Sequence, residues 1–176
     1  MPQSIFQGTD MKPPSIPLQK ILGLEPACLR MTVPESYRDR NGHMNMRWYL
    51  AIFDEAGDDL QVRLGLMPEY LREHRAAMFD LEHHLHYLSE VNPGEDVAVY
   101  ARLVAQSAKR VHYLLFMVNE TRGRLAAICE CMSAFVDLAV RKTAPFPPAI
   151  QAKIAAWVAS DTARDWPPPV CGAMQV

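Results

Sequence analysis

One short loop of this chain gathers groups that can act on a carbonyl. Residues 39 to 45 read Asp-Arg-Asn-Gly-His-Met-Asn and directly precede a segment with helical spacing. A carboxylate such as Asp39 can act as a general base or as a nucleophile. Backbone N–H groups at the start of a helix can stabilise a carbonyl oxygen that gains charge. We therefore expect Asp39 to be catalytic, with the N–H groups of Gly42 and His43 holding the oxyanion.

A purely structural interpretation accounts for the same residues one at a time. Asp39 and Asn45 are residue types that cap helices, and Asn41-Gly42 is a common turn sequence. The catalytic interpretation rests on their occurrence together. For Asn45 both roles stay open, a cap for the loop and helix or a contact to substrate.

The segment after the loop predicts a long helix. Asn45 is a suitable N-cap, and Gly65 marks the expected end. Asp59 and Arg63 lie four residues apart on the polar face, where they form a favourable pair. The apolar positions follow helical spacing and comprise Tyr49, Ile52, Phe53, Ala56, Leu60 and Leu64.

Strand-like runs precede and follow this helix. We expect one strand before the loop and four after the helix, over residues 29–35, 77–87, 96–106, 111–119 and 125–137. The short breaks between the last four predict an antiparallel meander, and the element order predicts an α+β fold in which the sheet wraps the helix. Because an open sheet edge is normally covered or paired, we expect a homodimer or higher homo-oligomer.

Composition limits the class of protein. The 176 residues carry a net charge of -2 and are 49% hydrophobic, which suits one globular domain without a general attraction for nucleic acid or membranes. No run approaches the roughly 18 apolar residues of a membrane span, so we expect a cytoplasmic protein. We assign residues 1–26 to a flexible N-terminal arm, 27–159 to the domain with its C-terminal helix, and 160–176 to a Pro-rich tail.

The cysteines are expected to be reduced and structural. Cys28 and Cys171 lie far apart in sequence. Cys129 and Cys131 flank one residue on an expected strand, and we expect their thiols to point to opposite faces and to be poor zinc ligands.

The sequences of the loop and of the helix after it resemble those of a known family. The loop from Asp39 to Asn45 and the helix sequence from Tyr49 to Ala56 resemble the signature of hot-dog-fold acyl-CoA thioesterases of the 4-hydroxybenzoyl-CoA thioesterase type. The resemblance continues through residues 82–96, 108–112 and 135–148. Within this superfamily, the loop together with the Ala-Pro-Phe-Pro-Pro stretch at 144–148 is most similar to betainyl-CoA thioesterases of carnitine breakdown.

The resemblance implies hydrolysis of an acyl-CoA thioester without a cofactor. It places the catalytic acid at Asp39 and implies supporting roles for Asn41 and His43, Asn41 orienting water or carboxylate and His43 tuning the local charge. Asp39 would either deprotonate a water molecule or attack the thioester to give a mixed anhydride, and the sequence leaves both routes open. Two other functions also stay open, a non-catalytic module that binds acyl-CoA and a hot-dog hydratase acting on an enoyl thioester.

Several residues are candidates for binding substrate. Trp48 lies beside the loop, one position off the apolar stripe, and an aromatic face there suits the trimethylammonium of a betaine, as do Tyr37, Tyr87 and Tyr113. Lys109 and Arg110, at an expected turn, suit the phosphates of coenzyme A, with Arg141 and Lys142 next. Glu82, His84 and His86 share one strand face; we expect Glu82 and His84 to support the site and no metal to bind there.

Overall fold

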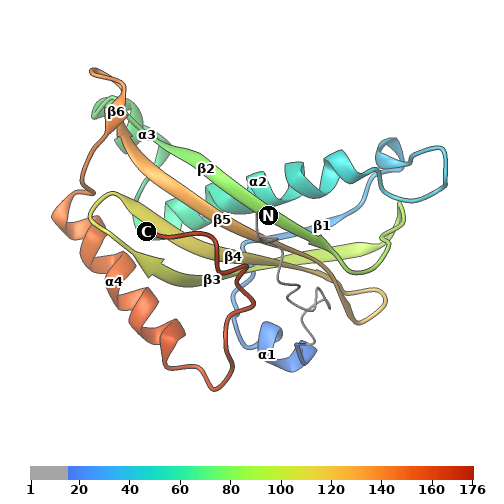
Figure 1. Ribbon diagram of the computed structural model, residues 1–176. Helices are drawn as coiled ribbons and strands as arrows, with labels where there is room; N and C mark the ends of the chain where they lie inside the picture. Colours follow the sequence, from blue (N-terminus) through green and yellow to red (C-terminus); the bar gives the residue numbers. More distant parts are fainter. Residues whose placement is uncertain (1–15) are drawn as a thin grey trace, which may run out of the picture.

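The computed structural model describes residues 16–176, and most of the predicted N-terminal arm lies outside them. The helices are α1 (Leu18–Leu22), α2 (Met46–Leu64), α3 (Pro68–Glu73) and α4 (Pro148–Thr162), with a 3-10 turn, η1 (Glu35–Tyr37). The strands are β1 (Leu29–Thr32), β2 (Ala76–Tyr87), β3 (Asp96–Gln106), β4 (Arg110–Asn119), β5 (Arg124–Asp137) and β6 (Lys142–Thr143). These elements form the layers drawn in Figure 1.

The long helix α2 forms as its sequence predicts. The side chain of Asn45 accepts the backbone N–H of Arg47 at 3.1 Å, and Gly65 ends the helix in the left-handed conformation with φ 96°. All six predicted stripe residues are buried. The Asp59 to Arg63 ion pair is present as well, with a 2.5 Å contact.

A single antiparallel sheet carries the fold. Its strand order is β1-β3-β4-β5-β2, and β6 pairs with the far end of β5. The sheet curves along α2 (Figure 1), and the core between them joins the α2 stripe to residues such as Val99, Leu115 and Cys129. The α+β hot-dog architecture expected from the sequence is therefore confirmed, and β3, β4 and β5 form the expected antiparallel meander. The predicted pairing of β2 with the next strand is wrong, because the connection after β2 carries the chain past β5 and β4, and β2 pairs with β5 instead.

The opposite face of the sheet is covered by segments that the sequence assigns to the arm and the tail. Ile21 of α1 is fully buried, and Trp166 packs edge-on against Phe116. Both belong to a second apolar cluster with Tyr100 and Leu114. Residues 16–26 and the part of the tail around Trp166 thus pack against the sheet, although the sequence assigns residues 16–26 to a flexible arm. The prolines suggest a flexible segment, but the burial of apolar side chains in the second cluster holds these residues against the sheet.

Two local expectations are wrong. β1 is only four residues long, because the chain turns at Val33-Pro34 into η1 instead of continuing to Glu35. The Sγ atoms of Cys129 and Cys131 lie 3.3 Å apart on one face of β5. The reason is the two-residue period of a strand, which places residues i and i+2 on the same side.

The outermost strands of the sheet are the short β1 on one side and the long β2 on the other. The 12 residues of β2 pair only with β5 in the part of the chain that the structure describes.

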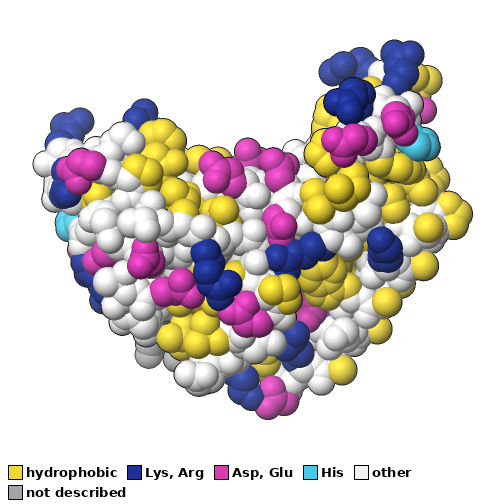
Figure 2. Space-filling model, turned by 180° about the vertical axis from the view of Figure 1, so that it is seen from behind, with side chains coloured by type: hydrophobic (Ala, Val, Ile, Leu, Met, Phe, Trp, Pro, Cys, Tyr) yellow, Lys and Arg dark blue, Asp and Glu magenta, His cyan; other side chains and the backbone are white. Residues whose placement is uncertain are grey.

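Within residues 16–176, no helix is both long and apolar enough to cross a membrane. On the face shown in Figure 2, acidic and basic side chains are interspersed rather than gathered by sign.

Candidate functional site

The loop from Asp39 to Met44 is attached to the rest of the fold at both ends. The Met44 N–H donates to the Val91 carbonyl at 2.8 Å, which ties the loop to the connection between β2 and β3. The Asn45 N–H donates to the Tyr37 carbonyl at 2.9 Å and joins the start of α2 to η1. The loop is therefore held between η1, the start of α2 and the connection between β2 and β3.

Within the loop, one carboxylate oxygen of Asp39 is occupied and the other is free. Oδ1 accepts the backbone N–H of Asn41 at 2.7 Å and that of His43 at 3.3 Å. The main chain closes the same ring, with Asp39 N–H donating to the His43 carbonyl at 2.8 Å. Oδ2 has no hydrogen-bond partner among residues 16–176. Asp39 is half-buried, so this oxygen is held in place yet available for chemistry.

The loop needs a glycine at position 42. Gly42 has φ +90°, a conformation that side chains with a Cβ adopt only with strain. Its N–H donates to the Asp39 carbonyl at 3.1 Å, and the Arg38 guanidinium donates to the Gly42 carbonyl at 2.7 Å. The N–H groups of Gly42 and His43 are thus both engaged with Asp39, which differs from the expectation that they are free for an oxyanion. These hydrogen bonds fix the position of Asp39 within the loop.

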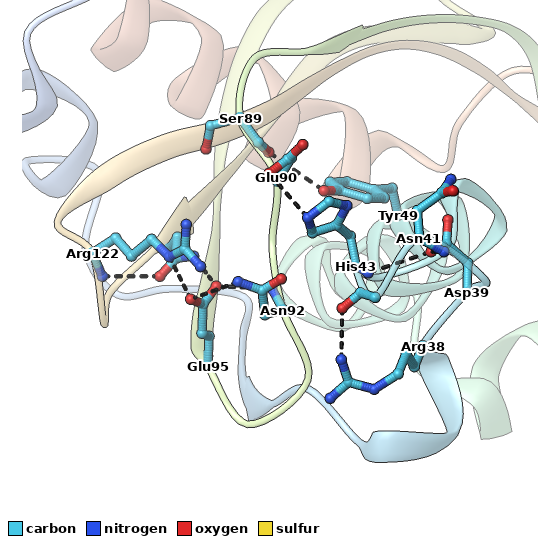
Figure 3. A network of polar contacts seen from close by, with 12 residues as sticks. Arg38, Asp39, Asn41, His43, Tyr49, Ser89, Glu90, Asn92, Glu95 and Arg122 are labelled. Carbon is cyan, nitrogen blue, oxygen red and sulfur yellow. Dashed lines mark hydrogen bonds and ion pairs between the residues drawn. The ribbon is translucent and has the colours of Figure 1, made fainter.

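His43 and Asn41 present their side chains on the outside of this ring (Figure 3). Nε2 of His43 lies 3.2 Å from a carboxylate oxygen of Glu90, in the connection after β2. Asn41 is exposed, and its amide makes no hydrogen bond to any residue that the structure describes. The structure therefore brings together Asp39, Asn41 and His43, and it adds Glu90 to them.

Comparison with known proteins places this site in a family. The family model described as the thioesterase-like superfamily matches residues 33–154, which include the loop, α2 and the whole meander. The chain belongs to the thioesterase-like superfamily. The hydrolase class and the fold expected from the sequence are confirmed by this match.

Individual relatives agree. A betainyl-CoA thioesterase of Pseudomonas aeruginosa is 32% identical over 118 residues, which are 67% of this chain and 74% of that protein. An L-carnitine dehydrogenase/betainyl-CoA thioesterase of Agrobacterium fabrum is 33% identical over 64% of this chain, and the match spans only 23% of that longer protein. This chain thus corresponds to a minor part of the fused relative.

Solved structures give the same picture. A Staphylococcus aureus protein in complex with CoA superposes with a TM-score of 0.75 at 26% identity, covering 84% of this chain and 93% of that one. A putative thioesterase from Pseudomonas putida gives 0.70 at 29% identity, covering 86% and 97%.

In this thioesterase, Asn45 and Trp48 make structural contacts. Asn45 is the N-cap of α2. The Trp48 ring stacks on Tyr37 with centroids 3.8 Å apart, and the Arg47 guanidinium lies 4.7 Å from its centroid. Since these neighbours already contact the ring of Trp48, it is a poorer surface for a ligand cation than its position in sequence suggests.

An open hollow of about 260 Å³ lies beside the His43–Glu90 contact. It is lined by Tyr49, Tyr87, Leu88, Ser89 and Glu90. Tyr87 is 49% exposed, and its ring meets that of Tyr49 edge-on, with centroids 5.2 Å apart. An aromatic ring and a carboxylate therefore line one recess next to the Asp39 loop.

A polar network supports the connection under the loop. The Glu95 carboxylate accepts hydrogen bonds from the backbone of Asn92 at 2.8 Å and the amide of Asn119 at 2.7 Å, and it pairs with Arg122 (Figure 3). Partial burial raises the pKa of Glu95, but these donors outweigh it and hold the pKa below its ordinary value.

The remaining predicted binding residues lie away from the loop in this chain. His84 is on the sheet face opposite α2, with Nδ1 3.9 Å from Glu130, and Glu82 is exposed on the same strand. Lys109 and Arg110 are exposed at the turn between β3 and β4. That turn is at the far end of the strands from Glu95, so the structure does not bring them to Asp39 within one chain.

Sequence reasoning missed Glu90 and Glu95. Both lie near the Asn92-Pro93-Gly94 turn, which the sequence identifies only as a break between strands. The available signal was the presence of two carboxylates around that turn, and their partners are set by tertiary contacts.

Proposed function

We propose that this thioesterase hydrolyses betainyl-CoA to betaine and coenzyme A, with Asp39 as the catalytic carboxylate. The observation that carries the chemical role is the free Oδ2 of Asp39 beside an Oδ1 fixed by two backbone N–H groups. The acyl group is supported by the named activity of the Pseudomonas aeruginosa relative and by the recess beside the loop.

The chemistry follows from the groups present. Oδ2 of Asp39 either removes a proton from water or attacks the thioester carbon, and in the second route water then cleaves the mixed anhydride. The departing thiolate comes from a thiol with a pKa of about 8.5, so its loss needs little acid assistance. The exposed amide of Asn41 is placed to orient water, and the His43–Glu90 pair sets the charge beside the carbonyl.

The recess suits a cationic acyl group of small size. A trimethylammonium would meet the exposed ring of Tyr87 and the carboxylate of Glu90, an aromatic and an anionic partner together. Tyr37, Trp48 and Tyr113, the other aromatic candidates, are stacked or buried within the fold. Tyr87 is therefore the aromatic residue that we assign to the acyl group.

We propose a homodimer built through the β2 edges. Antiparallel pairing of two β2 strands about a two-fold axis turns one sheet end for end relative to the other. The turn carrying Lys109 and Arg110 in one copy then lies at the same end as the Asp39 loop of the second copy. This arrangement supplies cations for the phosphates of coenzyme A that a single chain does not bring to the loop.

The test is a comparison of two substrates that differ only in charge. In tert-butylacetyl-CoA a carbon replaces the nitrogen of betainyl-CoA, so shape is kept while the cation is removed. We expect free-thiol release to favour betainyl-CoA, and Tyr87→Leu to lower its kcat/KM roughly two- to five-fold, from about 0.5–1 kcal/mol for an exposed cation–π contact. The same variant should leave tert-butylacetyl-CoA unaffected. Equal turnover of both substrates by the native protein would contradict the betainyl assignment.

A further inference from the structure

Three metal-binding side chains meet on the α2 side of the sheet. Cys129 and Cys131 are buried on β5, with Sγ atoms 3.3 Å apart. His83 is on the neighbouring strand, in register with Cys131. One ring nitrogen of His83 and both sulfurs lie within 4.8 Å of one another. Two sulfurs and an imidazole form a ligand set that zinc commonly uses.

The histidine of this group is held in place by a carboxylate. Oδ2 of Asp80 lies 3.2 Å from Nε2 of His83. The same carboxylate accepts a hydrogen bond from Ser133, whose hydroxyl lies 3.1 Å from that of Tyr113. A neutral His83 whose Nε2–H faces Asp80 carries its lone pair on Nδ1, and Nδ1 is the nitrogen that we assign to the metal. Metal-binding histidines in proteins commonly have such a partner.

There is room for an ion beside these groups. A small cavity of about 20 Å³ is lined by His83, Cys129 and Cys131, and by Asp54 and Gly57 of α2. A space of roughly 10–15 Å³ or more holds one water-sized particle. Ligand atoms around a tetrahedral zinc ion lie roughly 3.5–3.8 Å apart, given Zn–S and Zn–N distances of about 2.3 and 2.0 Å. The 3.3 Å between the two sulfurs is a few tenths of an ångström below that spacing.

A disulfide is a poorer use of the two thiols. Residues i and i+2 of a strand are about 6.6 Å apart along the strand, near the upper limit of the Cα separation of a disulfide. The same spacing on one face aims both sulfurs at a shared point, which suits chelation. The rest of the chain's cysteines, Cys28 and Cys171, do not contribute to this cluster.

We propose that His83, Cys129 and Cys131 form a binding site for Zn²⁺ or a similar thiophilic divalent ion. Both thiols bind as thiolates, so two protons pass to solvent for each ion taken up, and the resulting centre with neutral histidine carries no net charge. A water molecule in the adjoining cavity completes the tetrahedron. This site is separate from the Asp39 loop, and the inference does not depend on the proposed thioester chemistry.

The test is metal uptake by the full-length reduced protein after removal of metals. Zn²⁺ affinity is measured by competition with a chromogenic chelator, and Co²⁺ serves as the spectroscopic probe for sulfur ligation in a tetrahedral site. We expect one ion per chain and a thiolate-to-Co²⁺ charge-transfer band. Asp80→Asn should weaken Zn²⁺ binding about 10- to 100-fold, as is typical for a partner of a metal-bound histidine. His83→Gln and Cys129→Ser should weaken it further and remove the band.

Two control variants keep the result specific. Cys28→Ser removes a buried thiol outside the cluster, and Cys171→Ser removes an exposed thiol that lies near His84 and Glu130. Both should bind Zn²⁺ as the native protein does. His83 is partly exposed, so His83→Gln tests the site without opening the core. Absence of uptake by the native protein, unchanged affinity in His83→Gln, or loss in Cys171→Ser instead would overturn the proposal.

Discussion

The backbone N–H of Asn41 donates to Oδ1 of Asp39 at 2.7 Å, so the loop itself fixes one oxygen of this carboxylate. This hydrogen bond requires the chain to turn back within four residues, and Gly42 at φ +90° makes that turn. The second oxygen, Oδ2, is the one that we propose acts on the substrate. A change in the conformation of the loop is therefore expected to move the Asp39 carboxylate as well.

Gly42→Ala should damage both stability and turnover. The space around Gly42 is open, with the Arg38 guanidinium 3.8 Å from an added Cβ, so the cost is backbone strain of roughly 1–2 kcal/mol. Strain in the loop shifts Asp39, and kcat should fall. Gly94→Ala is the matched control, since Gly94 has φ +87° and open space but lies outside the Asp39 loop. Urea unfolding and thiol release measure both variants, and equal turnover in the two would contradict this account.

Asn45 should behave as a helix cap. Asn45→Ala removes the acceptor for the Arg47 N–H and should lower the free energy of unfolding by about 1 kcal/mol. Asn45→Ser keeps a capping oxygen, so its urea midpoint and kcat/KM should stay near native values. A loss of turnover in Asn45→Ser at native stability would instead support the predicted contact to substrate.

Lys109 and Arg110 should matter for the coenzyme part of the substrate. Replacing both by alanine should raise KM for acyl-CoA roughly two- to 30-fold, from about 0.2–1 kcal/mol for each exposed charge contact. An acyl-pantetheine thioester lacks the nucleotide phosphates, and its KM should not change. The double alanine variant of Arg141 and Lys142 is the comparison pair. A larger effect there would place the phosphates elsewhere.

Glu95 should contribute stability that is lost in acid. Its pKa in the folded protein is below its ordinary value of 4.5, because hydrogen bonds and Arg122 outweigh the effect of burial. The contribution is therefore complete above pH 4.5 and disappears as the pH falls through the lower, folded-state pKa. Urea midpoints of the native protein and Glu95→Gln should differ most above pH 4.5 and converge as the pH falls through the lower, folded-state pKa. A gap that widens in acid would refute this role.

The sequence predicts the parts of the fold that depend on local pattern. The α2 stripe from Tyr49 to Leu64, the Asn45 cap and the four strands β2 to β5 follow from periodicity and turn residues, and the structure has these strands within one residue of the predicted bounds. The Asp39 loop is also identifiable, because an acid, an amide and an imidazole stand together before a helix.

Long-range packing explains what the sequence does not predict. Nothing local shows that Trp166 folds back onto Phe116, or that Ile21 covers the outer face of the sheet. The His43–Glu90 contact joins residues 47 positions apart through the β2–β3 connection. The engagement of the Gly42 and His43 N–H groups is likewise a detail of loop geometry that composition leaves undetermined.

The most direct measurement is thiol release from betainyl-CoA by the native protein and by Asp39→Asn. Asparagine keeps an Oδ1 acceptor for the Asn41 N–H, so far-ultraviolet circular dichroism and binding of a non-hydrolysable CoA thioether should stay as in the native protein. We predict that kcat falls by at least about 10²- to 10⁴-fold, the usual loss of a general base. Turnover by Asp39→Asn within tenfold of the native rate would show that Asp39 is a structural residue of the loop.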